Sequence, residues 1–260
     1  MNIDLSGKHA VVCGSTQGIG KAVALGLSKR GASVTLVARN EEKLSKVLSE
    51  LNPNDNHDYI VADFSNPEEL KAKIERWSQV KKAHILVNNT GGPKGGPIVE
   101  ASTEEFLNAF SQHLICNHIL VKALYPGMKE LGYGRIINVI STSVKQPLDG
   151  LGVSNTIRGA VANWSKTLAN ELGRHNITVN NVLPGATNTS RLQSIASTKA
   201  EKTDGMNTET VLAQMAAQSP MQRIAQPEEV ANAVVFLASP AANYINGINI
   251  PVDGGRTKSL

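Results

Sequence analysis

The sequence predicts an α/β protein built on a three-layer, doubly wound parallel sheet of about seven strands. Short runs of β-branched and apolar residues alternate with longer stretches of helical periodicity along the whole chain. These runs are continuously apolar, which is typical of parallel strands that helices cover on both faces. In addition, a glycine-rich turn joins the first strand directly to the first helix.

The expected strands are short and bounded by turn-forming residues. They cover residues 9–13, 33–38, 59–62, 84–88, 135–140, 178–183 and 247–252. No internal repeat or linker interrupts the pattern, so residues 1–260 are predicted to form a single domain.

Helical patterns fill the intervals between the strands. They are expected over residues 19–30, 41–51, 103–129, 154–172 and 227–238, and from Pro67 onward. Asn66 and Pro67 are typical of a helix start. The helix over 103–129 is expected to bend before Pro126, because proline cannot donate the helical hydrogen bond. Residues 190–218 are polar and poorly patterned, which predicts a mobile lid.

The composition is that of a globular protein. Hydrophobic residues make up 41% and charged residues 18% of the chain, which argues against disorder. The net charge of +4 comes without a dense Lys/Arg tract, and aromatic residues make up only 4%, so no nucleic-acid partner is expected. Cys13 and Cys116 lack the spacing of metal ligands, so no metal is expected.

No membrane association is expected either. No apolar run reaches the roughly 18 residues that a membrane span needs. The first residues lack the charged region and apolar stretch of a secretory signal. These features predict a cytoplasmic protein.

The glycine-rich turn carries the first functional signal. Its residues are Gly14, Ser15, Thr16, Gln17, Gly18, Ile19 and Gly20. Such a turn between a strand and a helix lets the backbone approach a pyrophosphate, which the free N–H groups of the helix then bind. The turn therefore predicts a dinucleotide site.

The spacing G-x-x-x-G-x-G resembles that of the short-chain dehydrogenase/reductase family. Further motifs resemble the family in the same order: Asn88-Asn89-Thr90-Gly91, the strand ending in Ser141, Pro184-Gly185 followed by Thr187 and Thr189, and the tail FLASPAANYINGINIPVDGG. The resemblance covers essentially the whole chain. It implies a Rossmann fold and hydride transfer between a nicotinamide and a carbonyl or alcohol. It also implies a homo-oligomer (dimer or tetramer) formed through the helices 103–129 and 154–172 and through the last strand and its helix.

The end of the second strand favours NADP(H) over NAD(H). NAD enzymes of this type have an acidic residue there that binds the ribose hydroxyls, whereas this chain has Ala38 and Arg39. A guanidinium can pair with a 2′-phosphate, although Arg39 could also be a solvated loop charge. The resemblance further assigns to cofactor binding Asp63, Phe64, Asn89, Thr90, Gly91, Arg158, Pro184, Gly185 and Thr187. Asp63 could alternatively cap a turn at the end of its strand.

The catalytic positions depart from the family. The family uses a serine, a tyrosine, a lysine four positions after it and a helix asparagine. Counting along the motifs gives Ser141 for the serine, Ser154 for the tyrosine, Arg158 for the lysine and His113 for the asparagine. This pattern resembles an atypical subgroup with Ser-x-x-x-Arg, labelled 3-oxoacyl-carrier-protein-reductase-like.

The replacements change the acid–base chemistry. A serine is a far weaker acid than a tyrosine, whose pKa is about 10, and an arginine gives a fixed charge that does not shuttle protons. His113 is expected to titrate near neutrality and could relay a proton, or could be a hydrogen-bonded helix residue without a catalytic role. Lys94 and Lys145 are the other candidate acids, or else solvated loop charges.

Three functions therefore remain open. The first is an NADP(H)-dependent oxidoreductase that reduces a 3-oxoacyl-type or other small ketone, so that its partner is a small carbonyl or alcohol. The second is an NADP(H)-binding protein, a sensor or structural partner, that has lost redox catalysis. The third is non-redox elimination or hydrolysis through Ser141 and His113.

Overall fold

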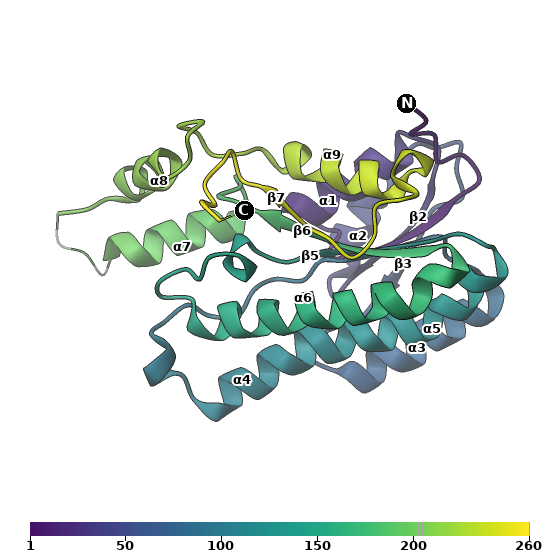
Figure 1. The fold of residues 1–260 in the computed structure, drawn as a ribbon, viewed down its shortest axis with the longest axis horizontal. Helices are drawn as coiled ribbons and strands as arrows, with labels where there is room; N and C mark the ends of the chain where they lie inside the picture. The colour runs from purple at the N-terminus through teal and green to yellow at the C-terminus, as the bar shows by residue number, and fades with distance from the viewer. Residues whose placement is uncertain (202, 204, 260) are drawn as a thin grey trace.

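Seven parallel strands form one sheet in the computed structural model, which describes residues 1–201, 203 and 205–259 (Figure 1). The strand order is β3-β2-β1-β4-β5-β6-β7, so the winding reverses between β1 and β4. This confirms the predicted doubly wound sheet. Lys202 and Asp204, which fall within the expected lid, and Leu260 lie outside the described residues.

The strands lie close to their predicted positions. They are β1 His9–Cys13, β2 Ser33–Ala38, β3 Asp58–Val61, β4 Ile85–Asn88, β5 Gly134–Val139, β6 Ile177–Pro184 and β7 Asn249–Val252. The first two match their predicted ranges. The others shift by one or two residues at their ends, where hydrogen bonding and not hydrophobicity sets the boundary.

Helices cover both faces of the sheet (Figure 1). One core packs the sheet against α1 Gly18–Ser28, α2 Glu41–Leu48 and α9 Pro227–Ala238. The other packs it mainly against α3 Pro67–Val80, α5 Cys116–Glu130 and α6 Gly152–Leu172. No helix among the described residues is long and apolar enough to cross a membrane.

The predicted helix over 103–129 consists of three segments. It begins as α4 Thr103–Phe110, passes through a π-helical turn over Ser111–Ile115, and continues as α5. The irregularity in this predicted helix therefore lies at the π-helical turn. The helix α5 includes Pro126 and continues beyond it. A π-turn takes up an extra residue and reorients the side chains within it, and here it contains His113.

The expected lid contains two helices, α7 Ser190–Glu201 and α8 Thr208–Ala217. They extend away from the sheet beyond the ends of the strands (Figure 1). Their buried residues are only Leu192, Ala196 and Val211. Helices that bury so little need no strong apolar stripe, which explains why residues 190–218 show no clear helical pattern.

An asparagine ladder crosses four neighbouring strands and fixes their register. The Asn88 amide donates to Asn138 at 2.8 Å, Asn138 donates to Asn181 at 3.0 Å, and Asn181 donates to Asn249 at 2.8 Å. The first three side chains are almost fully buried. Because a buried amide is costly without partners, a register slip would be strongly disfavoured.

Histidines lie at the opposite, amino edge of the sheet. His84 accepts a hydrogen bond at Nδ1 from the backbone N–H of His9, and the His9 Nε2 lies 2.7 Å from the Thr35 hydroxyl. Burial lowers the pKa of both imidazoles from 6.5 to about 4, assisted at His84 by nearby Lys8. The folded protein therefore holds them neutral.

This pKa difference predicts acid-sensitive stability. The unfolded chain takes up protons below about pH 6.5 while the folded histidines stay neutral until about pH 4, so stability is complete above pH 7 and is lost as pH falls through that window. His84→Asn keeps an acceptor for the His9 N–H but cannot titrate. We expect its free energy of unfolding to fall by about 1–2 kcal/mol less than that of the native chain between pH 7.5 and 5.0.

Urea denaturation at the two pH values measures this difference. His118→Asn, at an exposed position on α5, is the matched control and should keep the native pH dependence. Equal losses in the native chain and in His84→Asn would contradict the assignment.

Candidate functional site

An open pocket of about 610 Å³ lies at the carboxyl edge of the sheet, where the winding reverses. The turn after β1, the loops after β4, β5 and β6, and the start of α7 surround it. The predicted site residues that line it are Gly14, Thr16, Gln17, Gly18, Ile19, Arg39, Asp63, Phe64, Asn89, Thr90, Gly91, Ser141, Ser154, Arg158, Pro184, Gly185 and Thr187. Ser15, Gly20 and His113 are not part of this lining.

The glycine turn is built by close backbone contacts. Gly14 has a φ of +60°, and a Cβ there would lie 2.2 Å from the Asn89 carbonyl oxygen. A Cβ on Gly20 would lie 2.2 Å from the Gly14 carbonyl oxygen, so Gly20 serves packing and not ligand contact. Ser15 is fully buried, and its hydroxyl lacks a partner among the described residues. Ser15, which was predicted to bind the cofactor, thus lies outside the lining of the pocket.

The first turn of α1 is suited to bind phosphate. The helix begins at Gly18, and the side chain of Gln17 does not cap it. Its first N–H groups therefore face the pocket without a side-chain acceptor, and the positive end of the helix dipole points the same way. The residues present fit a pyrophosphate at this position.

Arg39 and Asp63 mark the far end of the pocket. Asp63 accepts a hydrogen bond from the Ser65 N–H at 2.9 Å, which lowers the pKa of its carboxyl group together with the charge of Arg39. Asp63 therefore does cap a turn at the end of its strand, which was the alternative role predicted for it. Arg39 is exposed and has no salt bridge in the part of the chain that the structure describes. A cation here fits the extra phosphate of NADP(H).

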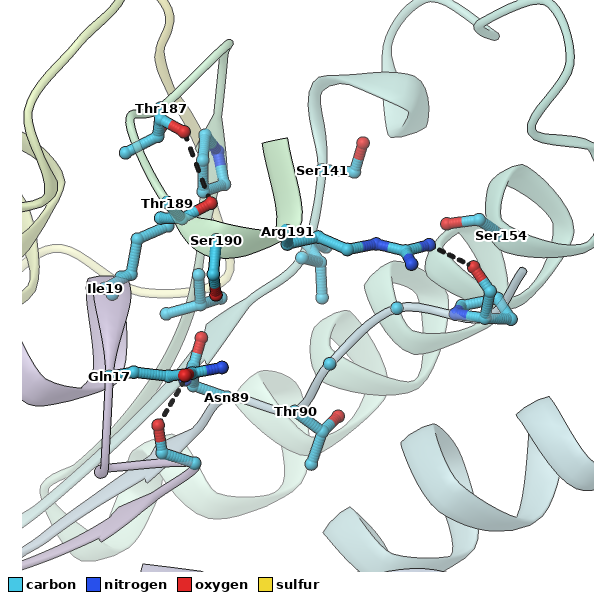
Figure 2. A pocket seen from close by; sticks show the side chains of 18 of the residues that line it. Gln17, Ile19, Asn89, Thr90, Ser141, Ser154, Thr187, Thr189, Ser190 and Arg191 are labelled. Carbon is cyan, nitrogen blue, oxygen red and sulfur yellow. Dashed lines mark hydrogen bonds between the residues drawn. The ribbon is translucent and has the colours of Figure 1, made fainter. Parts of the chain in front are cut away.

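Ser141 and Ser154 supply two hydroxyl groups to the other end of the pocket (Figure 2). Ser141 begins a short 3-10 turn after β5, and its Oγ accepts from the Ser143 N–H at 3.0 Å. This bond uses an acceptor lone pair, so the hydroxyl hydrogen can still be donated. Ser154 lies half-buried near the start of α6.

Arg158 is buried one turn further along α6, with an exposed fraction of 6%. Its Nη2 donates a long bond of 3.5 Å to the Thr90 carbonyl. Burial and the charge of Arg191 lower the pKa of its guanidinium to about 10. Arg158 therefore remains a cation at neutral pH, as expected for a fixed charge.

His113 lies behind the pocket wall. Its Nδ1 is 2.6 Å from the Thr90 hydroxyl, and the side chain is almost fully buried. Burial, and then the nearby charge of Arg158, lower the pKa of the imidazole to about 3. The expectation that it titrates near neutrality is therefore wrong, because the sequence does not reveal how deeply the π-turn buries it. The geometry is that of a neutral residue that orients Thr90.

Several lining residues were not predicted from the sequence. They are Gly92, Pro93, Gln112, Leu151, Ser190, Arg191, Leu192 and Ile195. Arg191 reaches across from the first turn of α7, and its Nη2 donates to the Pro93 carbonyl at 2.5 Å (Figure 2). In the sequence, the position of Arg191 just after the motif residues Thr187 and Thr189 is the feature that could have indicated its place in the pocket.

Comparisons with known proteins agree with this geometry. The sequence profile described as enoyl-(acyl carrier protein) reductase matches residues 14–257. A 3-oxoacyl-(acyl-carrier-protein) reductase FabG of Rickettsia bellii is 34% identical over 97% of this chain and 98% of its own. The NADPH-dependent reductase BacG of Bacillus subtilis is 30% identical over 98% and 100%.

A solved structure is also similar over its whole length. The L-sorbose reductase of Gluconobacter frateurii, complexed with NADPH and L-sorbose, has a TM-score of 0.93 and 35% identity, with 100% of both chains covered. Sequence, sheet order and glycine turn thus lead to the same conclusion: the chain belongs to the short-chain dehydrogenase/reductase family.

Proposed function

We propose that this chain is an NADP(H)-dependent oxidoreductase that reduces the carbonyl group of a small molecule, of the 3-oxoacyl type or another small ketone. One observation carries the proposal: a single pocket is lined by the glycine turn at one end and by Ser141 at the other. The similar L-sorbose reductase was solved with NADPH and L-sorbose, and BacG is named an NADPH-dependent reductase, which supports the same cofactor and reaction type.

The cofactor would occupy this pocket. The N–H groups at the start of α1 would bind its pyrophosphate, and Arg39 its 2′-phosphate. The residues proposed beside its remaining parts are Asp63, Phe64, Asn89, Thr90, Gly91, Pro184, Gly185 and Thr187. When bound, NADPH supplies the hydride that the carbonyl carbon receives.

The residues of the chain then act on the carbonyl oxygen. The Ser141 hydroxyl donates a hydrogen bond to it, and the fixed charge of Arg158 stabilises the negative charge that develops there. Ser154 adds a second hydroxyl group at the same end of the pocket as Ser141. Water in the open pocket delivers the proton, because His113 is neutral and Arg158 holds its protons tightly. This is the chemistry of a Ser-x-x-x-Arg subgroup without the tyrosine and lysine of the family.

We further propose that residues 1–260 form one cytoplasmic domain with a mobile lid over 190–218, and that the chain forms a homo-oligomer, a dimer or tetramer. The single sheet supports one domain. Cys13 and Cys116 are free thiols, which suits a reducing compartment. Exposed apolar residues along α4 and α5, among them Leu107 and Phe110, are suited to a subunit interface.

A second candidate is an NADP(H)-binding protein without redox activity. Ser154 and Arg158 favour it, because they stand where the family has its proton donor and the lysine beside it. The two candidates share the cofactor site and differ only in hydride transfer.

Cofactor preference tests the role of Arg39. Arg39→Gln removes the charge opposite the 2′-phosphate, so NADPH binding should weaken about 10- to 100-fold while NADH binding stays within about twofold. Titration of the reduced cofactor's fluorescence measures both. Arg30→Gln, an exposed arginine at the other end of α1, is the control. An equal loss for NADPH and NADH would refute the assignment.

Ser141 tests the reaction itself. NADPH oxidation is followed with a panel of small ketones and acetoacetyl thioesters, and the products are analysed for hydride transferred from deuterated NADPH. Ser141→Ala should lower kcat/KM about 100-fold or more without changing the Kd of NADPH, because it removes an oxyanion donor. Ser143→Ala keeps the backbone N–H beside Ser141 and serves as the control. Tight NADPH binding without deuteride transfer by the native chain would favour the second candidate.

The pH profile tests the neutral state of His113. Because its pKa is about 3, kcat/KM should show no inflection from this residue between pH 5.5 and 8, and His113→Asn should leave the shape of the profile unchanged. An inflection near pH 6.5 that disappears in His113→Asn would instead assign the proton relay to His113.

A further inference from the structure

Two arginines from different helices converge on one point of the pocket. A Cβ placed on Gly92, in the loop after β4, would lie 3.9 Å from Nη2 of Arg158 and 4.0 Å from Nη2 of Arg191. Arg158 comes from α6, whereas Arg191 comes from the first turn of α7. The electrostatic effect of Arg191 on Arg158 agrees with this close approach.

Neither arginine has an acidic partner among the described residues. Their hydrogen bonds go to backbone carbonyl groups, from Arg158 to Thr90 and from Arg191 to Pro93. Asp63 is the one carboxylate lining the described pocket, and it lies at the far end beside Arg39. A guanidinium that is 94% buried without a counter-ion is costly, and a second cation beside it adds repulsion. A bound anion would remove both penalties.

The pair lies at the reacting end of the pocket. Figure 2 shows the Arg191 side chain extended across the pocket, with its guanidinium directed toward Ser154. The phosphate-binding turn before α1 is a separate part of the lining and has its own donors. The charge is therefore available to the substrate.

We propose that the substrate is a small oxoacid whose carboxylate is bound between Arg158 and Arg191, an inference that rests on the proposed carbonyl reduction. A planar guanidinium offers paired N–H donors that match a carboxylate, and two of them at one point select strongly for a charged ligand. The carboxylate would be held within a few bonds of the carbonyl that Ser141 binds. A neutral ketone or ester of the same size would give Arg191 no carboxylate to bind and would leave Arg158 only the carbonyl oxygen.

The first experiment measures binding without turnover. Malonate has two carboxylates and no ketone, so the protein cannot reduce it. It is titrated by calorimetry into the complex of the protein with NADP⁺. We expect Arg191→Gln to weaken malonate binding at least about tenfold, and Arg191→Lys to weaken it less. Arg76→Gln, an exposed arginine on α3, removes the same charge and should change nothing.

The second experiment compares matched substrates. Acetoacetate and 2-oxobutanoate are tested against their methyl esters, and kcat/KM is measured for each pair. The native chain should prefer the acid by at least about tenfold, and Arg191→Gln should abolish most of that preference. Malonate binding that depends on Arg191, with no reduction of any carbonyl, would support the anion site while removing the proposed oxidoreductase activity.

Three outcomes would overturn the inference. One is no malonate binding, or binding that Arg191→Gln leaves unchanged. Another is equal kcat/KM for acids and esters. The third is a loss of NADPH affinity in Arg191→Gln as large as the loss for malonate, which would mean that Arg191 serves a phosphate of the cofactor.

Discussion

The close contact between the glycine turn and the end of β4 is the constraint on which the site depends. The backbone of Gly14 lies against the Asn89 carbonyl with no room for a Cβ, and the Asn89 side chain donates to the carbonyl groups of Cys13 and Gly14. This contact ties the phosphate turn to the loop that begins at Thr90. Through Thr90 it reaches His113 and Arg158, so both ends of the pocket are joined by one chain of contacts.

The phosphate-binding half and the acid–base half of the site depend on different groups of the chain. Phosphate binding depends on backbone N–H groups and a helix end, which the fold itself supplies. Acid–base chemistry depends on side chains, which can change without disturbing the fold. Ser154 and Arg158 illustrate this, because both occupy regular positions on α6 while their chemistry differs from that of a tyrosine and a lysine. The family's fold thus persists in a chain for which we propose a different proton transfer.

Sequence patterns predicted those features of the fold and the site that depend on neighbouring residues in the chain. Continuous apolar runs located the strands, the glycine spacing located the phosphate turn, and motif counting located Ser141 and Arg158. The rest depends on tertiary structure. The π-turn and the burial that keeps His113 neutral arise from packing of α5 against its neighbours, and Arg191 joins the pocket only because α7 lies beside it. No local pattern carries that information.

The asparagine ladder has a consequence for how the sheet responds to a change of pH. Amides gain and lose no charge across the physiological range of pH, and their hydrogen bonds run between neutral groups. The bonds that join β4, β5, β6 and β7 through this ladder therefore do not change with proton concentration. A reaction that consumes a proton at every turnover is thus supported by cross-strand bonds that do not themselves gain or lose protons.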